Sequence, residues 1–502
     1  MSRNLRPLLL LLPLLASACE VGPDYKRPHF ALPGNWFGGD ESTTQSVTPA
    51  GETIPVDWWK SYNDDALTAL IEEGLKHNTD LMVAAARVAQ ARAQLTYDQA
   101  ELYPELDATG GATRTRNSAL ATVGGFKPST TPYNDFNIGA VLSYEVDLWG
   151  KLRRATESGR AQLLSAKANR DAIRIAVASD VAQGYFNLLA LDAQIAVTQD
   201  TIKARSSEMD YQGKQYKYGA VDGLTLNEAK AELAAAQAAL PTLQQAREEQ
   251  ASALGVLLGR DPKDLVEGEV KEGKALNVLP VPPVMPTDLP STLMERRPDI
   301  VAAEQQLVAA NAQIGVAKAD YFPAISLSAL LGLDSSQLGH TLSLRARNWE
   351  FGGSLAAPLL DFGRTSSGVA QAKGVRDEAL ADYRQVVLGA FKEVLDAMSA
   401  QKTSDGRVKA QQAQVKARAD ALHLAVLRYD AGYSEYLEQL DAQRNLYDAQ
   451  LQTITAQRDR LIASVTLYKA LGGGWQNEEL YKKLHPAPAK APDAPAPDPS
   501  KP

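Results

Sequence analysis

The residue types that most often perform chemistry are sparse in this chain of 502 residues. The histidines stand at positions 29, 77, 340, 423 and 485, and their spacing matches no H-E-x-x-H or related metal-binding pattern. A single cysteine excludes intramolecular disulfides and cysteine-rich metal centres. The sequence has neither a G-x-S-x-G nucleophile turn nor a G-x-x-x-x-G-K-[ST] phosphate loop. We therefore expect a protein that is not an enzyme, holds no metal or dissociable cofactor, and supplies no energy of its own.

The one cysteine, Cys19, has a context that indicates acylation. Two arginines precede the apolar run Leu8 to Leu15, and the small residues Ala16 to Ala18 come directly before the cysteine. The apolar run is shorter than the roughly 20 residues of a membrane-spanning helix, so residues 1–18 are typical of a removable signal peptide. The segment resembles a bacterial lipobox, which implies a diacylglycerol group and an N-acyl chain on Cys19. The alternative is a buried structural thiol.

The overall composition restricts the class of protein. Lys and Arg total 52 and Asp and Glu total 60, which gives a formal net charge of −8. This mild acidity argues against a nucleic-acid partner, because such a protein needs a basic face. Hydrophobic residues make up 45% of the chain, enough for a folded protein, and they are mainly Ala and Leu, which favour helix.

Three pairs of landmarks recur in the same order along the chain. Ala91-Arg-Ala-Gln-Leu95 leads to Pro104, just as Ala310-Asn-Ala-Gln-Ile314 leads to Pro323, 219 residues later. The remaining pairs are Gly150 with Gly363 and Gly219 with Gly432, each 213 residues apart. One such match could arise by chance between Ala-rich helices, but three at nearly one offset indicate an internal tandem repeat.

Each repeat changes its hydrophobic period along its length. Helical periodicity covers residues 84–102 and 300–319, whereas alternation with a period of two covers 106–116, 136–147, 325–333 and 349–360. Each alternating segment is close to the 9–11 residues of a tilted transmembrane strand. An ordinary soluble hairpin has the same alternation, so this pattern alone leaves both possibilities open.

Very long helices are predicted after each hairpin. Residues 150–218 and 363–429 contain no proline, and after short breaks at 219–223 and 432–434 helices continue to about 258 and 471. A helix of about 65 residues would be about 100 Å long, which no compact domain contains. Leu440, Tyr447, Ile454 and Leu461 repeat every seven residues, the spacing of a supercoiled seam. Four strands cannot close a barrel. If these strands lie in a membrane, the barrel must therefore be shared between several chains.

Several motifs resemble those of the TolC-like outer-membrane efflux family. They are Asp57-Trp-Trp-Lys60, Asn78-Thr-Asp-Leu81, Glu295-Arg-Arg-Pro-Asp-Ile300, Ala309-Ala-Asn-Ala-Gln-Ile-Gly315, Tyr321-Phe-Pro323 and Asp361-Phe-Gly-Arg364. Cys19 followed by Val21-Gly-Pro-Asp-Tyr25 is similar to the lipoprotein branch of that family, the OprM and NodT type. The resemblance covers nearly all of residues 19–475.

The resemblance implies an α+β fold that assembles as a trimeric channel-tunnel. Its parts would be a 12-stranded transmembrane β-barrel with four strands per chain, a long α-helical periplasmic tube and a mixed equatorial region. The implied domains are the signal peptide 1–18, a lipid-anchored and equatorial segment 19–76, a first repeat 77–259 with a β-hairpin 106–147, an equatorial linker 260–297, a second repeat 298–471 with a β-hairpin 325–361, and an equatorial segment 472–502 that ends in a Pro/Ala-rich disordered tail.

The implied function is the outer-membrane channel of a tripartite efflux pump in a Gram-negative bacterium. Its partners would be two further copies of itself, a periplasmic adaptor (membrane fusion) protein, an inner-membrane transporter of the resistance-nodulation-division (RND) type, and outer-membrane lipid. Drugs or other small solutes are the first expectation for the cargo. The alternatives are a conduit for type I protein secretion and a structural lipoprotein that spans the envelope without conducting.

The family resemblance also implies a periplasmic gate near residue 430. Asp441 and Glu438 match the aspartates of the aperture, Tyr429 matches a gate tyrosine, and Leu437 matches a constricting leucine. Some members carry an arginine where this chain has Ser434. In a trimer, three copies of Asp441 would form a ring that attracts cations. The alternative is an exposed i,i+3 acidic pair on a helix.

Overall fold

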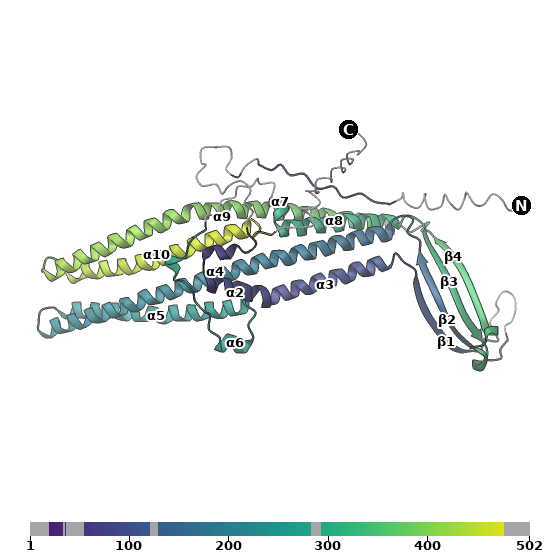
Figure 1. The fold of residues 1–502 in the computed structure, drawn as a ribbon, viewed down its shortest axis with the longest axis horizontal. Coiled ribbons are helices and arrows are strands. Elements are labelled where there is room, and N and C mark those ends of the chain that lie inside the picture. Colours follow the sequence, from purple (N-terminus) through teal and green to yellow (C-terminus); the bar gives the residue numbers. More distant parts are fainter. Residues whose placement is uncertain (1–19, 34–35, 37–54, 121–128, 283–292, 476–502) are drawn as a thin grey trace, which may run out of the picture. The chain divides into compact units, whose positions relative to one another are not determined.

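The computed structural model describes residues 20–33, 36, 55–120, 129–282 and 293–475. The predicted signal peptide, Cys19 and the Pro/Ala-rich tail lie outside these residues. The described chain is mostly helical with one four-stranded antiparallel sheet (Figure 1). The long helices are α3 (Thr79–Ala100), α4 (Lys151–Lys217), α5 (Gly223–Leu257), α8 (Pro298–Ala319), α9 (Arg364–Asp430) and α10 (Tyr436–Ala470). The shorter ones are η1 (Trp58–Tyr62), α2 (Asp65–His77), α6 (Pro262–Glu267), η2 (Leu276–Val278), α7 (Leu293–Arg296), η4 (Leu338–His340) and η5 (Leu344–Ala346).

Internal contacts divide the chain into two units. The first, called the sheet unit, comprises the described parts of Met1–His29, Arg87–Lys167 and Ala302–Arg384. The second, called the helical unit, comprises the described parts of Phe30–Ala86, Ala168–Val301 and Gln385–Pro502. Among the described helices, none is both long enough and apolar enough to cross a membrane.

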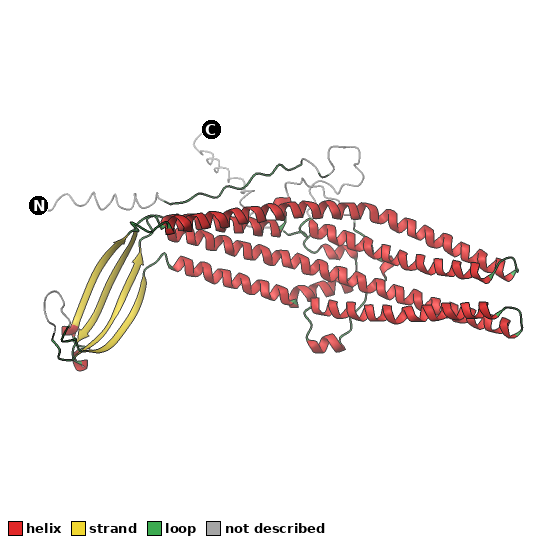
Figure 2. Cartoon of the chain, turned by 180° about the vertical axis from the view of Figure 1, so that it is seen from behind, coloured by secondary structure: helices red, strands yellow, loops and turns green. Residues whose placement is uncertain are grey.

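The sheet, yellow in Figure 2, consists of β1 (Glu105–Thr115), β2 (Tyr133–Glu145), β3 (Ala324–Ser335) and β4 (Arg347–Ala356). The strands pair in that order, as labelled in Figure 1. β1 and β4 are therefore its two edges. The prediction that the fourth strand extends to residue 360 is wrong, because β4 ends at Ala356. Pro358 follows two residues later, and a proline has no backbone N–H with which to continue a ladder.

The register sorts the strand residues onto two different faces. Leu106, Leu142, Ala329 and Phe351 stand opposite one another across the four strands and so share one face. That face also carries Ile138, Leu331, Trp349 and Leu355, and its only charges are Arg114 and Arg347. The other face carries every carboxylate of the four strands: Glu105, Asp107, Asp135, Glu145, Asp334 and Glu350. One face is thus mainly apolar and the other is acidic.

Equivalent turns connect the sheet to the two longest helices. Asp147 accepts hydrogen bonds from the backbone N–H of Leu152 (3.2 Å) and Arg153 (3.0 Å) at the start of α4. Asp361 accepts from the N–H of Gly363 (3.0 Å) and Thr365 (2.9 Å) at the start of α9. Hydrogen bonds from the Thr365 side chain and from these backbone groups lower the pKa of Asp361 to about 2. Both helices thus begin at an aspartate cap, as N-terminal N–H groups require.

Two antiparallel helical hairpins build the helical unit. In the first, α5 returns along α4, with an Arg247–Asp192 ion pair at 2.5 Å and a hydrogen bond from Gln250 to the carbonyl oxygen of Gly184 (3.2 Å). In the second, α10 returns along α9, with ion pairs that join Arg407 to Asp459 and Arg460 to Asp405. The turns of the hairpins contain Gly219 (φ 74°) and Gly432 (φ 76°), in the left-handed region that favours glycine.

Aromatic side chains fix the segment before α2 in the helical unit. Trp58 of η1 is buried and stacks on Tyr468 of α10, with ring centroids 5.1 Å apart. Tyr62 is fully buried, and its hydroxyl hydrogen-bonds with the hydroxyl of Ser464 at 2.5 Å. Asp57-Trp-Trp-Lys60, one of the motifs noted in the sequence, therefore contributes to the core of this unit.

Candidate functional site

The predicted gate residues lie on either side of the turn between α9 and α10. Leu437, Glu438 and Asp441 are on the first turns of α10 and are exposed, whereas their neighbours Tyr436 and Leu440 are buried. The helical spacing therefore brings Leu437, Glu438 and Asp441 onto one exposed side of α10.

The two carboxylates of this exposed side have different partners. Glu438 forms an ion pair with Arg428 of α9, with 3.1 Å between Nε and Oε1, and both side chains are about half exposed. Asp441 accepts a hydrogen bond of 2.9 Å from the amide of Asn445. An amide is neutral and leaves the carboxylate charge in place. Asp441 is thus the stronger candidate for a charged constriction, while the charge of Glu438 is offset within the chain.

Tyr429 points away from this exposed side. Its hydroxyl donates a hydrogen bond of 3.1 Å to Oε1 of Gln212 on α4, and its ring lies 5.5 Å from the ring of Tyr436. It packs against the buried cluster of Ala229, Tyr436 and Leu440, and this burial raises the pKa of the Tyr429 hydroxyl. The structure therefore groups three of the four predicted residues and places the fourth at the contact between the two helical hairpins.

A buried ionic network close to these residues was not predicted from the sequence. Glu232 of α5 lies between Arg205 of α4 and Arg444 of α10. Arg205 donates to the backbone carbonyl oxygen of Glu232 (2.9 Å) and contacts its carboxylate at 3.2 Å, and Arg444 donates from Nε to the same carboxylate at 2.7 Å. The side chains of Arg205 and Glu232 are only 7% and 9% exposed.

The network joins three helices at one level. The guanidinium of Arg205 also lies 5.6 Å from the ring centroid of Tyr447, whose hydroxyl hydrogen-bonds with Thr198 at 2.9 Å. Because Arg444 follows Asp441 by three residues on α10, the network fixes the rotation of that helix next to the candidate gate. The one sequence signal was a glutamate within the Ala-rich run from Ala231 to Leu240.

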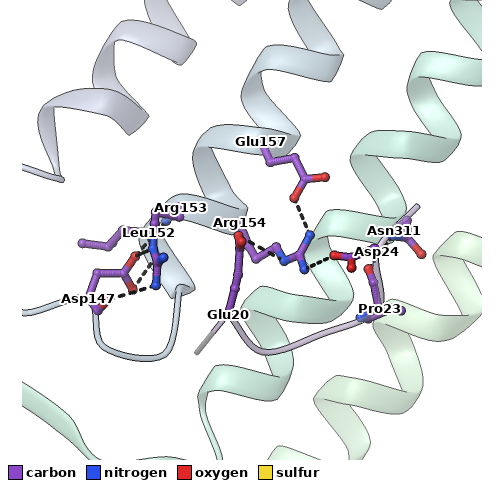
Figure 3. Close-up of polar contacts among 9 residues, drawn as sticks. All are labelled: Glu20, Pro23, Asp24, Asp147, Leu152, Arg153, Arg154, Glu157 and Asn311. Atoms are coloured by element: carbon purple, nitrogen blue, oxygen red, sulfur yellow. Dashed lines mark hydrogen bonds and ion pairs between the residues drawn. The ribbon is translucent and has the colours of Figure 1, made fainter. Parts of the chain in front are cut away.

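A second ionic cluster lies in the sheet unit, beside the residues that follow Cys19 (Figure 3). Arg154 of α4 is 5% exposed and contacts Asp24 at 2.7 Å, Glu157 at 2.7 Å and Glu20 at 3.3 Å. Burial alone would lower the pKa of its guanidinium, but hydrogen bonds to Asp24 and Glu157 raise it above the ordinary value. Arg154 therefore stays charged and fixes the start of the described chain. In the part of the chain that the structure describes, no three His, Cys, Asp or Glu side chains are grouped to hold a metal ion.

A model of the family described as outer membrane efflux protein matches residues 70–260 and 289–473 of this chain. The chain belongs to the outer membrane efflux protein family. The antibiotic efflux pump outer membrane protein ArpC of Pseudomonas putida is 34% identical over 466 residues, which cover 92% of this chain and 94% of that protein. The cation efflux system protein CusC of Escherichia coli is 30% identical over 464 residues, with 92% and 97% coverage.

Solved structures agree with the family assignment. The CmeC outer membrane channel of Campylobacter jejuni superposes with a TM-score of 0.85 at 26% identity, covering 93% of this chain and 97% of that one. The prediction of a TolC-like efflux protein of the outer membrane is confirmed. As a member of the outer membrane efflux protein family, the chain acts in outer-membrane efflux. The gate assignments and the acylation of Cys19 stay predictions.

Proposed function

We propose that this efflux protein is the passive outer-membrane conduit of a tripartite pump, which receives solutes from a periplasmic adaptor and an inner-membrane RND transporter. The observation that carries the proposal is the sheet, with one apolar and one acidic face. A sheet in a membrane needs an apolar face toward lipid and a polar face toward water.

Three copies complete the conduit in this proposal. β1 and β4 are edges of the four-stranded sheet, and open strand edges are not tolerated in lipid. Pairing β1 of one copy with β4 of the next in a closed ring of three gives a 12-stranded barrel, with the six carboxylates of each chain toward the water-filled interior. The helices then continue the passage into the periplasm.

The proposed tandem repeat is supported by the lengths of corresponding helices. α3 and α8 each have 22 residues, α4 and α9 each have 67, and α5 and α10 each have 35. In each repeat a pair of strands lies between the first and the second of these helices: β1 and β2 between α3 and α4, and β3 and β4 between α8 and α9. We keep the domain division at 77–259 and 298–471 for the two repeats, with 19–76, 260–297 and 472–502 as the equatorial segments.

The gate of the conduit is assigned to the first turns of α10. Three copies of Asp441 and Leu437, brought together by the three-fold axis, would form an acidic and an apolar ring. The ion pair of Glu438 with Arg428 and the hydrogen bond of Tyr429 to Gln212 hold α10 in place around that opening. Opening the ring would require these local contacts to rearrange.

The cargo is proposed to be small solutes, including drugs. Relatives of similar identity are named for antibiotic efflux and for cation efflux, so the channel itself discriminates weakly and the inner-membrane partner selects. Diacylglycerol and an N-acyl chain on Cys19 would anchor the N-terminus in the outer membrane. Type I protein secretion is the second candidate, and a non-conducting envelope lipoprotein is the third.

Planar-bilayer recording on the purified full chain tests the proposal. A conduit gives discrete conductance steps, and chemical cross-linking of the same sample gives a trimer. A protein that inserts without conducting would be a structural lipoprotein. Capture of cross-linked partners from intact cells then separates an RND transporter from a protein-secretion transporter.

A further inference from the structure

The residues Glu20–Arg27, here called the N-terminal strap, lie on a surface formed by α4 and α8 of the sheet unit (Figure 3). Near the start of the strap, the N–H of Val21 donates to the carbonyl oxygen of Trp149 at 3.0 Å. At its end, Arg27 forms an ion pair of 2.8 Å with Glu304, to which the Tyr25 hydroxyl also donates at 3.1 Å. The strap is thus held along its whole length.

The centre of this surface is the buried guanidinium of Arg154. Of its three carboxylate partners, Glu157 belongs to α4 itself, whereas Glu20 and Asp24 belong to the strap. A buried charge that loses its partners is strongly destabilising. If the strap leaves, Arg154 loses two of its three partners. The free-energy cost of that loss favours the bound strap.

The backbone of the strap approaches α8 too closely for any side chain between them. A Cβ atom on Gly315 would lie 2.7 Å from the carbonyl oxygen of Val21, and one on Gly22 would lie 2.6 Å from Cα of Gly315. Gly22 also has a φ of 123°, in the region that side-chain-bearing residues rarely adopt. Next to these glycines, Asn311 donates to the carbonyl oxygen of Pro23 at 2.8 Å. Shape and hydrogen bonding thus both match the strap.

The strap also contacts the turns that join the sheet to the helices. Trp149, which accepts from Val21, lies between β2 and α4. Its indole Nε1 donates to the carbonyl oxygen of Pro323 at 2.8 Å, and its ring stacks on Phe322 at 4.7 Å, both in the turn between α8 and β3. The bound strap is therefore connected to the base of the two central strands.

We propose that the surface around Arg154, Asn311, Gly315 and Glu304 is a peptide-binding site whose ligand is the mature N-terminus of the chain itself. The ligand class is an extended peptide with two carboxylates four residues apart, here Glu20 and Asp24. Bound there, the strap contacts the turns at the base of the sheet, an arrangement called the clasp below. It also holds Glu20, the residue after Cys19, against Gly150. The clasp does not depend on conduction.

Limited trypsin digestion of the purified full chain tests the clasp. Trypsin cleaves after Lys26, whose side chain is exposed, but a protease needs the flanking backbone free, so cleavage reports the strap leaving its site. The bond after Arg27 precedes Pro28 and resists trypsin. The measured quantity is the rate at which a new N-terminus appears at Arg27, read by mass spectrometry. Arg154→Gln removes charged hydrogen bonds and should raise that rate about tenfold or more.

Gly315→Ala is the sharper variant. Alanine stabilises a helix relative to glycine, so helix propensity alone would leave cleavage unchanged or slower. The added Cβ would lie 2.7 Å from the carbonyl oxygen of Val21 and 2.8 Å from Cγ of Arg154, so it obstructs the strap and its central cation and should make cleavage faster. The matched controls are Gly374→Ala, on α9 with open space around it, and Arg153→Gln, whose partner is Asp147 rather than the strap. Both controls should match the unaltered chain.

The clasp would be overturned if the rate of cleavage after Lys26 were the same in the unaltered chain, Arg154→Gln and Gly315→Ala. It would also be overturned if the two control variants accelerated cleavage as much as Arg154→Gln and Gly315→Ala do. Should Arg154→Gln fail to fold, Asp24→Asn is the deciding variant: it should accelerate cleavage after Lys26, and an unchanged rate would overturn the clasp. The Asp24 side chain is 86% exposed, so its replacement leaves no cavity. Where Arg154→Gln does fold, adding Asp24→Asn to it should not raise the cleavage rate further, because the two residues act on each other. Conductance is recorded on the same variants, so a protein that never conducts refutes the conduit without affecting this result.

Discussion

The substitution Glu232→Gln tests the network that holds α10 beside the candidate gate. The change keeps the size of the side chain but removes the negative charge shared by Arg205 and Arg444. Arg205 is 7% exposed, so it would be left as a buried cation, a situation that costs about 3–5 kcal/mol for a fully broken buried pair. Arg444 is 50% exposed, so solvent screening reduces its share to about 1 kcal/mol or less. Because glutamine still offers one acceptor oxygen, we expect a total loss of about 2–3 kcal/mol.

Hydrogen exchange measures this loss where it occurs. A change of about 2–3 kcal/mol in local opening corresponds to amide exchange about 30- to 150-fold faster in the affected helices. The expected segments are the start of α5, residues 223–236, and the start of α10, residues 436–447. Arg444→Gln should give only about fivefold, because that partner is half exposed. Glu249→Gln, an exposed glutamate on the same helix as Glu232, is the matched control.

Amide exchange accelerated no more by Glu232→Gln than by Glu249→Gln would refute a stabilising role for the network. This role would also be wrongly assigned if Arg444→Gln had the larger effect, since that would place the stabilisation at the exposed cation. Acceleration spread evenly over the whole chain would indicate general loosening rather than a local network.

Four further outcomes are expected. Asp441→Ala should lower both cation preference and block by divalent cations in planar bilayers, and unchanged values would move the constriction elsewhere. Cys19→Ala, exported with a non-lipoprotein signal, should still yield conducting trimers, whereas stable soluble monomers would contradict a lipid-independent pore. A tag at Ser129, in the connection between β1 and β2, should be labelled on intact cells, because the longer strand connections of outer-membrane barrels face the exterior, and labelling only after permeabilisation would invert this topology. The Asp361 cap should contribute fully to stability above about pH 4, the ordinary carboxyl pKa, and lose that contribution as pH falls through about 2, so thermal unfolding of Asp361→Asn should depend less on pH in this range.

The long helices were predictable because their signals are local. The predicted spans 150–218 and 363–429 agree within about one residue with α4 and α9, since proline is absent within each and glycine follows each end. The strands were found by alternation, and the one clear error, at the end of β4, came from giving the alternation more weight than Pro358. Of the predicted seam, Leu440, Ile454 and Leu461 are buried, as core packing requires.

The ionic contacts were not predictable, because each joins residues far apart in the sequence. Arg205, Glu232 and Arg444 come from three helices, and a rotation of one helix by a single residue turns a side chain by about 100° and separates the partners. The same holds for Glu20 and Arg154. Spacing alone could place Asp441 and Leu437 on one side of α10, but the direction of Tyr429 depends on which helix lies opposite it.

The sorting of charge on the sheet restricts the order of events by which the protein enters a membrane. A single copy would have to bring six carboxylates on one face into contact with hydrocarbon, which strongly disfavours its insertion. Copies that first turn their acidic faces toward a common interior expose only the apolar face to lipid. Strand pairing between copies should therefore precede or accompany insertion, so the rate of insertion into vesicles should rise more steeply than linearly with protein concentration. A strictly linear dependence would mean that single chains insert first.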